Sequence, residues 1–270
     1  MRLIIIIFSL INCLYLQGQP LSGKVLNKKN NQPIEFVNIG IIGKNIGTIS
    51  DMQGNYQLFI TPGLNDDTLM FSCIGYYPYM IRVSDFLKLK NEAIVLEEQI
   101  YDLNEVIVKP KDVKEKRLGA TTNSKMIVAG FIDNNMGYEC GILMNNKKTA
   151  FIKKVNANIA LCTYDTIFYR LNIYKVTKEK QFENILKEPI YINLSKDQVK
   201  NKVSIDLQEK NIVVEGDFLV TFEHIKNLGE GSLYFCAGLT KKTHYRKTSQ
   251  GNWETQPAGI AISVVADIEK

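Results

Sequence analysis

The two histidines are the first residues to test for chemistry, and neither lies in a pattern that a metal site requires. A zinc protease of the HExxH type needs two histidines one helical turn apart, whereas His224 is followed by Ile-Lys-Asn and His244 by Tyr-Arg-Lys. No serine lies in a GxSxG elbow, although counting residues leaves a Ser-His-Asp or Cys-His site open. The sequence predicts no catalytic residue, no metal and no cofactor, so we expect a protein that is not an enzyme.

The stretch NIGTISDMQGNYQLFI, residues 45–60, places side-chain oxygens at Asp51, Gln53 and Asn55. Calcium takes about six to eight oxygen ligands, usually with several carboxylates, and only one carboxylate is certain here. The stretch is more typical of a β-hairpin, because Asp51 can accept backbone hydrogens and Gly54 can adopt a positive φ that strains other residues. We therefore predict that Asp51 and Gly54 form a structural turn.

One large aromatic side chain lies in a polar segment near the C-terminus. Trp253, the single Trp, lies in SQGNWETQP, and Tyr245 and Arg246 lie in THYRKTS. A flat indole with amides and a cation nearby is typical of sugar stacking. The opposite interpretation is that Trp253 covers the end of a β-sandwich, and burial decides between the two. Trp253, Tyr245 and Arg246 are the candidate ligand-binding residues, with a polysaccharide as the ligand.

The elements that must position these residues are strands. Helical periodicity is nearly absent, while period-two alternation recurs between turn signals rich in Gly, Pro, Asn and Asp. In residues 166–176, for example, the alternation predicts one buried face and one wet face. We predict an all-β chain of two β-sandwich domains, at residues 20–108 and 123–270, joined by a charged linker at residues 109–122. About eight or nine strands in the second domain indicate a jelly-roll-like sandwich.

The N-terminal residues 1–19 predict export. One positive charge precedes an apolar run and then small or polar residues, which is typical of a secretory signal peptide. A lipoprotein signal ending at Cys13 is the competing interpretation, but Asn12 occupies a position that usually holds a small residue. No later stretch is apolar enough to span a membrane. The net charge of +5 is mild and gathers in the predicted linker, so we expect no nucleic-acid partner.

Four cysteines follow the predicted signal peptide, each in an apolar, strand-like context: Cys73, Cys140, Cys162 and Cys236. An exported chain can pair cysteines, but none of the four is in a CxxC pair. We favour free buried thiols, which pack as small hydrophobic groups, with two disulfides as the alternative.

Short features run in order through the first domain: Gly23 to Val25, Pro33, Gly47-Thr48 before Asp51 and Gly54, Tyr56, Ile74-Gly75-Tyr76, and Leu103 to Val108. Together they resemble the carboxypeptidase regulatory-like domain of exported Bacteroidetes proteins. The resemblance implies a transthyretin-like (prealbumin-like) β-sandwich.

The resemblance does not lead us to expect that this chain is itself a metallocarboxypeptidase or a TonB-dependent receptor. The metallocarboxypeptidase that such a domain can accompany needs an HxxE pair and a distant third histidine around zinc, and the sequence lacks that pattern. The same domain often precedes TonB-dependent outer-membrane receptors. The residues after Val108 are too few for a plug and a barrel of about 22 strands.

The second domain resembles a C-terminal module of the same exported proteins, through FYRLNIY, GDFLVTFEHI and TSQGNWETQPAGIAISV. That resemblance implies no activity. We expect a non-catalytic exported cell-envelope protein, in the periplasm or at the outer-membrane or cell surface, whose β-sandwich modules mediate contacts with an envelope protein partner or serve as a scaffold. The alternative is a glycan-binding accessory protein that acts through the C-terminal domain. A hydrolase ranks third, and a pocket with two carboxylates about 5 to 10 Å apart would favour it.

Overall fold

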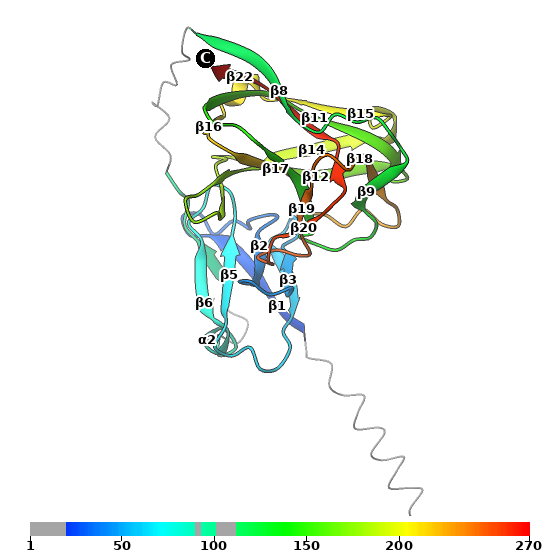
Figure 1. Cartoon of the computed structure of the whole chain (residues 1–270). Coiled ribbons are helices and arrows are strands. Elements are labelled where there is room, and N and C mark those ends of the chain that lie inside the picture. Colours follow the sequence, from blue (N-terminus) through cyan, green and yellow to red (C-terminus); the bar gives the residue numbers. More distant parts are fainter. Residues whose placement is uncertain (1–19, 90–92, 101–111) are drawn as a thin grey trace, which may run out of the picture.

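The computed structural model describes residues 20–89, 93–100 and 112–270. The predicted signal peptide, the Leu103 to Val108 run and the first residues of the predicted linker lie outside the described residues. Figure 1 shows two β-structured bodies, a smaller one from the N-terminal part of the chain and a larger one from the C-terminal part. The expectation of an all-β chain built of β-sandwiches is confirmed.

The smaller body, called the first sandwich, has one sheet of three strands and one of four. The first sheet has the order β4 (Asn55–Phe59), β1 (Pro20–Asn27), β7 (Ile94–Leu96). The second has the order β3 (Gly47–Ile49), β2 (Asn38–Ile41), β5 (Thr68–Ser72), β6 (Tyr79–Arg82), and the short helix α2 (Val83–Phe86) follows β6. Alternation along β4 sends Tyr56 and Leu58 into the core and leaves the other three side chains exposed.

The larger body, called the second sandwich, has one sheet of seven strands and one of eight. The seven-stranded sheet contains β13 (Phe182–Asn184), β12 (Thr166–Val176), β17 (Phe218–His224), β10 (Glu139–Met144), β19 (Thr243–Arg246) and β20 (Glu254–Gln256) in this order, with β14 (Ile190–Ser195) paired to β12. The eight-stranded sheet contains β21 (Gly259–Ile260), β18 (Leu233–Gly238), β11 (Thr149–Cys162), β22 (Ile262–Glu269) and β8 (Val113–Gly119) in this order, and β15 (Lys202–Asp206), β16 (Val213–Glu215) and β9 (Ile127–Phe131) pair off this path. Two short 3-10 turns, Lys196–Gln198 and Gln208–Lys210, flank β15. The facing sides of the two sheets share one hydrophobic core.

The predicted linker at residues 109–122 is wrong for its described part, because residues 113–119 form strand β8. This strand pairs antiparallel with β22 along its whole length, from Val113 opposite Glu269 to Gly119 opposite Ser263. Its charged side chains are exposed while Leu118 packs against the core. A strand at the edge of a sheet carries many charges for the same reason as a linker, since both are solvated. The sequence pattern alone did not separate the two.

The predicted wet face of β12 is also wrong. Ile167, Tyr169, Leu171 and Ile173 lie in the core as expected, but Arg170, Asn172 and Tyr174 on the opposite face are buried as well. The first sandwich and the segment around Trp253 cover this face. Alternation therefore reported which side chains share a face, but not what lies over the polar one.

The two sandwiches are in direct contact. Phe36 and Ile49 of the first form a small buried cluster with Ile225 of the second, and the partly buried Met136, Phe168 and Tyr191 pack against it. Hydrogen bonds also cross the junction, from Gln250 Nε2 to Ser72 Oγ (2.8 Å) and from Asn252 Nδ2 to the carbonyl of Gly43 (2.8 Å).

Two further sequence expectations concern cysteines and membranes. The four cysteines are free thiols, with Cys140 and Cys236 buried and Cys73 and Cys162 partly buried. Within the described residues, none of the helices has the length and apolar character needed to cross a membrane.

Candidate functional site at the junction of the two sandwiches

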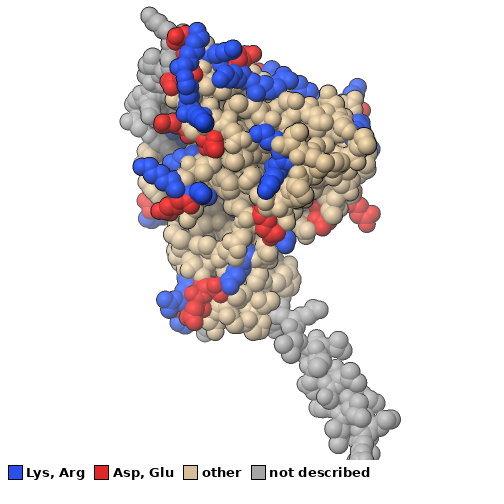
Figure 2. All heavy atoms as spheres, in the orientation of Figure 1, with Lys and Arg blue, Asp and Glu red and all other residues tan. Residues whose placement is uncertain are grey.

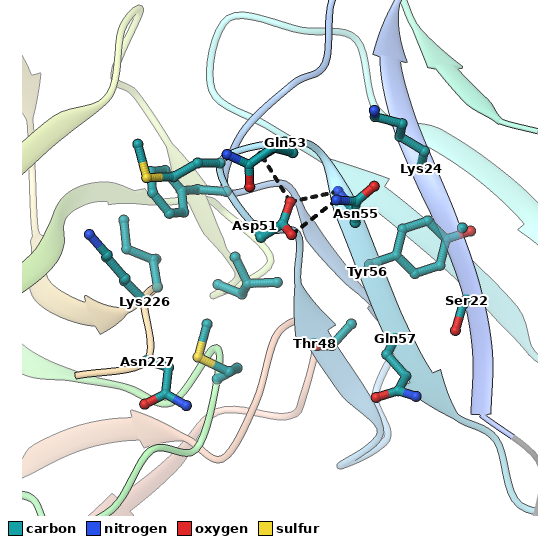
Figure 3. Close-up of a pocket in the computed structure, with 16 residues that line it drawn as sticks. Ser22, Lys24, Thr48, Asp51, Gln53, Asn55, Tyr56, Gln57, Lys226 and Asn227 are labelled. Atoms are coloured by element: carbon teal, nitrogen blue, oxygen red, sulfur yellow. Dashed lines mark hydrogen bonds between the residues drawn. The ribbon is translucent and has the colours of Figure 1, made fainter. Parts of the chain in front are cut away.

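A groove of about 940 Å³ lies where the two sandwiches meet (Figure 3). The first sandwich contributes strands β1, β3 and β4 and the turn between β3 and β4. The second contributes the loop before β10 and the residues just after β17. Its apolar lining consists of Phe36, Ile49, Met52, Met136 and Ile225. Residues from both sandwiches therefore form one surface, which neither has by itself.

The turn at one side of the groove is held by the Asp51 carboxylate. Oδ1 accepts the backbone N–H groups of Gln53 and Asn55 at 2.8 Å each, and Oδ2 accepts Asn55 Nδ2 at 3.1 Å (Figure 3). Gly54 has φ +74°, the left-handed conformation that side chains disfavour. The Asp51 oxygens are thus directed at the turn itself, and no group of metal ligands was found among the described residues.

Strand β4 presents a free edge at this groove. It is the end strand of its sheet and pairs only with β1 among the described strands. The backbone N–H and carbonyl of Asn55 bond to Asp51, on the side away from β1. Alternate residues of a strand direct their backbone groups to the same side, so the N–H and carbonyl groups of Gln57 and Phe59 also point away from β1. An extended peptide can pair with such groups.

Few charges surround the groove. The charged side chains among its described lining residues are those of Lys24, Lys226 and Asp51. Among the described residues, neither lysine forms an ion pair, and the Lys226 ammonium lies 5.2 Å from the centre of the Phe168 ring. The groove is therefore apolar at its base and has uncompensated positive charge at its rim.

Phe36 holds the junction in a strained conformation. Its φ is +53°, which is rare for a residue with a bulky side chain. Its ring lies 5.4 Å from that of Phe168 and 5.5 Å from that of Tyr191, while its N–H bonds to the carbonyl of Ser50 (3.2 Å). Strain of this kind persists only where surrounding contacts compensate for it. Here the compensating contacts belong mostly to the other sandwich.

Beside the groove, a buried ionic cluster lies on the face of the seven-stranded sheet that the first sandwich covers. Glu139 and Glu223 are direct cross-strand neighbours with no exposed surface. Arg170 bonds to Glu223 (Nε to Oε2, 3.0 Å) and Arg246 bonds to Glu139 (Nε to Oε2, 2.7 Å). Asn172, Tyr174 and Thr221 donate further hydrogen bonds to Glu139. Two fully buried carboxylates thus face two guanidinium groups.

The pKa values of the two glutamates are shifted in opposite directions. Burial raises the pKa of Glu139, and the nearby Arg246 charge offsets only part of that effect. Burial acts on Glu223 as well, but Arg170 and Arg246 together outweigh it and lower the pKa of Glu223. Because both side chains are enclosed and fully hydrogen bonded to protein groups, they lack the access to water and substrate that a pair of hydrolytic carboxylates needs.

Arg170 connects this cluster to the first sandwich. Its Nη1 donates to the carbonyl of Phe36 (2.8 Å) and its Nη2 to Oδ1 of Asn38 (2.5 Å). A single guanidinium thus joins Glu223 of one sandwich to the backbone of the other, which matches the planar set of donors that Arg offers. The three charged members of the cluster other than Arg246, namely Glu139, Arg170 and Glu223, were not predicted from the sequence. Each is a single charge inside an apolar strand, a pattern that also describes an ordinary solvent-facing residue.

The candidate sugar-binding residues Trp253, Tyr245 and Arg246 do not lie together on one exposed surface, and their binding of a polysaccharide stays a prediction. Arg246 is buried in the ionic cluster, and Tyr245 is on the opposite face of β19, stacked on Tyr138 against the core. Trp253 is half-buried, with its ring 5.2 Å from the Arg246 guanidinium carbon and in edge contact with Tyr174 and Phe182. The indole ring packs on the Arg246 guanidinium group and is not free to stack on a sugar ring.

Both histidines are used in packing. The His224 ring is in edge contact with Phe131 and Tyr169, and its Nε2 lies 2.7 Å from the carbonyl oxygen of Lys226. The His244 ring is in edge contact with Phe182. Burial lowers the pKa of each imidazole, which keeps both neutral near pH 7.

The first sandwich is similar to a known family of domains. Residues 21–108 match the family model of the CarboxypepD_reg-like domain. The chain contains such a domain. The matched residues end before the second sandwich, so they form only one side of the groove. No curated protein is significantly similar to this chain in sequence.

Two solved structures of infectious bursal disease virus particles align with much of the chain. The VP2 subviral particle shares 8% identity over 87% of this chain with a TM-score of 0.19, and the chain spans 61% of the length of that protein. The T=1 particle also shares 8% identity, over 94% of this chain and 78% of the other, with a TM-score of 0.19. At this level of similarity, neither alignment says anything about fold or function.

Proposed function

We propose that this protein is a non-catalytic, exported cell-envelope protein that holds an extended segment of a partner protein in the groove between its two sandwiches. The observation that carries the proposal is the free edge of β4 beside an apolar groove that both sandwiches line. Strand addition supplies main-chain hydrogen bonds, and an adjacent apolar surface accepts alternate side chains of the added strand. The contacts of Phe36 and Arg170 hold the two walls at a fixed separation.

The proposed partner segment has three expected features. Its backbone pairs with Gln57 and Phe59, one of its apolar side chains lies against Ile49 and Ile225, and a carboxylate flanks that side chain. The carboxylate is expected because Lys24 and Lys226 stand at the rim without ion-pair partners among the described residues. Export is supported by the signal-like residues 1–19. The mass of the exported protein tests that part, since removal of the signal peptide shortens the chain from its N-terminus.

Selection from a phage library of random 12-residue peptides, with the whole exported chain as bait, tests the groove. We expect enriched peptides that contain an apolar residue next to Asp or Glu. Gln57→Pro removes one outward N–H group at an edge position where proline is tolerated, and should weaken binding about tenfold or more. Gln57→Ala keeps that N–H and is the matched control, which should bind within about twofold of the parent.

Charge is tested separately. Lys226→Gln should weaken binding of the same peptides several-fold, with a smaller loss in high salt, whereas Lys178→Gln on an exposed turn should not change it. Peptides that bind Gln57→Pro as well as the parent, or a library without enrichment, would contradict the proposal.

A further inference from the structure

A second surface, far from the groove, has the composition of a ligand site. It lies on the outer side of the eight-stranded sheet, over β8, β22, β11 and β15. Figure 2 shows Lys and Arg side chains gathered at this end of the second sandwich. Two adjoining hollows, of about 430 Å³ and 160 Å³, share Arg117, Asn156 and Lys202 and so form one trough.

The strand register builds this trough. Asn156 on β11 lies directly opposite Ser263 on β22 and Ser204 on β15. One pair along, Lys154 lies opposite Val265, which in turn is opposite Arg117 on β8. Residues paired across strands share a face of the sheet, so these side chains all point outward.

The positively charged side chains of the trough differ in whether they form ion pairs with protein carboxylates. Lys153 contacts Glu115 at 2.6 Å and Asp267 at 3.5 Å, so its charge is neutralised locally. The side chains of Arg117 and Lys202, by contrast, form no hydrogen bond or ion pair with the described residues, although their backbones pair within the sheet. Two positive side chains therefore flank a shared hollow. The carboxylate among its described lining residues, Glu115, is already paired with Lys153, so the unpaired cations favour an anionic ligand.

An unsatisfied buried donor lies between these two cations. Asn156 is 3% exposed, and its Oδ1 accepts the Ser204 hydroxyl at 2.8 Å. Its Nδ2 is buried and has no hydrogen-bond partner within the part of the chain that the structure describes. Leaving a buried amide N–H unpaired costs about 1–3 kcal/mol, and such groups usually have a partner. Because Asn156 lines both hollows, an acceptor atom bound in the trough would satisfy it.

The remaining polar lining indicates what surrounds the anion. Hydroxyl and amide groups line the trough, from Ser204, Gln208, Thr121, Asn123 and Asn158. No aromatic side chain is among the described residues that line the two hollows, so a nucleobase would have no stacking partner there. Side-chain amides and hydroxyls can both donate to and accept from the hydroxyl groups of a sugar.

We infer that the trough binds an acidic saccharide whose anionic group lies between Arg117 and Lys202 and accepts a hydrogen bond from Nδ2 of Asn156. The anionic group is a carboxylate or a sulfate ester. The site shares no residue with the groove or with the Trp253 segment. Failure of this inference would therefore not count against the proposed function, nor the reverse.

Calorimetric titration of the whole exported chain tests the inference with four probes. These are tetragalacturonate, a sulfated disaccharide, an uncharged tetrasaccharide of galactose, and inorganic sulfate. We expect at least one acidic saccharide to bind more tightly than inorganic sulfate, because the sugar hydroxyls add contacts, and the galactose probe to show no binding. The comparison of the first two probes distinguishes a carboxylate from a sulfate ester.

Three variants locate the binding. Arg117→Gln and Lys202→Gln should each weaken it about tenfold or more, and Asn156→Asp should abolish it because a carboxylate replaces the donor. The matched control is Lys116→Gln, which removes an exposed charge from the opposite face of β8 and should leave the affinity within about twofold. Thermal melting of each variant separates lost binding from lost folding.

Several results would overturn the inference. They are equal weakening by Lys116→Gln and Arg117→Gln, equal binding of the charged and uncharged saccharides, binding of inorganic sulfate as tight as that of either acidic sugar, or no binding by a folded parent protein.

Discussion

Arg170 is a buried charged residue through which the two sandwiches contact each other. Its guanidinium bonds to Glu223 on one side and to the backbone of Phe36 on the other. A buried ion pair of this kind adds little net stability compared with an apolar replacement, but removal of one partner leaves an uncompensated charge. The residue therefore contributes more to the arrangement of the sandwiches than to the total stability of the chain.

Glu223→Gln should lower the free energy of unfolding by about 3 kcal/mol or more near pH 7, because Arg170 then keeps a buried charge without a carboxylate. Urea denaturation measures this loss. The matched control is Glu183→Gln, which breaks the exposed pair with Lys175 and should cost less than about 1 kcal/mol.

The pH dependence of this loss has a definite sign. The pKa of Glu223 is lowered in the folded protein, so its stabilisation is full above the pKa of an unfolded glutamate and is lost as pH falls through the folded value. The cost of Glu223→Gln should therefore shrink below about pH 4. The pKa of Glu139 is raised, so its effect on stability has the opposite sign and Glu139→Gln should cost less than Glu223→Gln at pH 7. A larger cost for Glu139→Gln would contradict the assignment of the two carboxylates.

At the scale of elements, the turn between β3 and β4 sets where the free edge of β4 begins. Gly54 combines a positive φ with a close approach, since an added Cβ would lie 2.6 Å from the carbonyl oxygen of Val25 on β1. A side chain at this position would strain the turn and also push β4 away from β1.

Gly54→Ala should therefore destabilise the protein by about 2 kcal/mol or more, as measured by thermal melting, because φ strain and the contact with Val25 add. Gly63→Ala is the matched control. Gly63 has φ +90° with nothing within 4 Å of an added Cβ, so that variant reports φ strain alone and should cost about 1 kcal/mol. Equal losses for the two variants would rule out the close approach as a cause.

At the scale of the whole molecule, the contacts across the junction predict that the two sandwiches unfold together. Calorimetry of the exported chain should show a single transition. Phe36→Asp places a charge in the buried cluster with Ile49 and Ile225, and should separate the transition into two. Phe59→Asp, at an exposed position on the first sandwich, is the control and should leave one transition. Two transitions in the parent protein would show that the junction is too weak to couple them.

Local signals in the sequence were sufficient for the strands, the core-facing side chains and the turn at Asp51 and Gly54. Period-two alternation and the φ preferences of glycine act over a few residues, so they can be read without knowledge of the partner strands. The family resemblance of residues 21–108 could be recognised from the sequence for the same reason, since it rests on short features in a fixed order.

Only the tertiary structure decided what each polar residue faces. The charges of Arg117 and its neighbours belong to an edge strand and not to a linker, because β22 lies beside them. Arg170 and Glu223 are buried because another sandwich covers their sheet, and Arg246 pairs with a residue more than a hundred positions away along the chain. An alternating strand specifies two faces, but the free energy that buries or exposes its polar face comes from contacts that are remote in sequence.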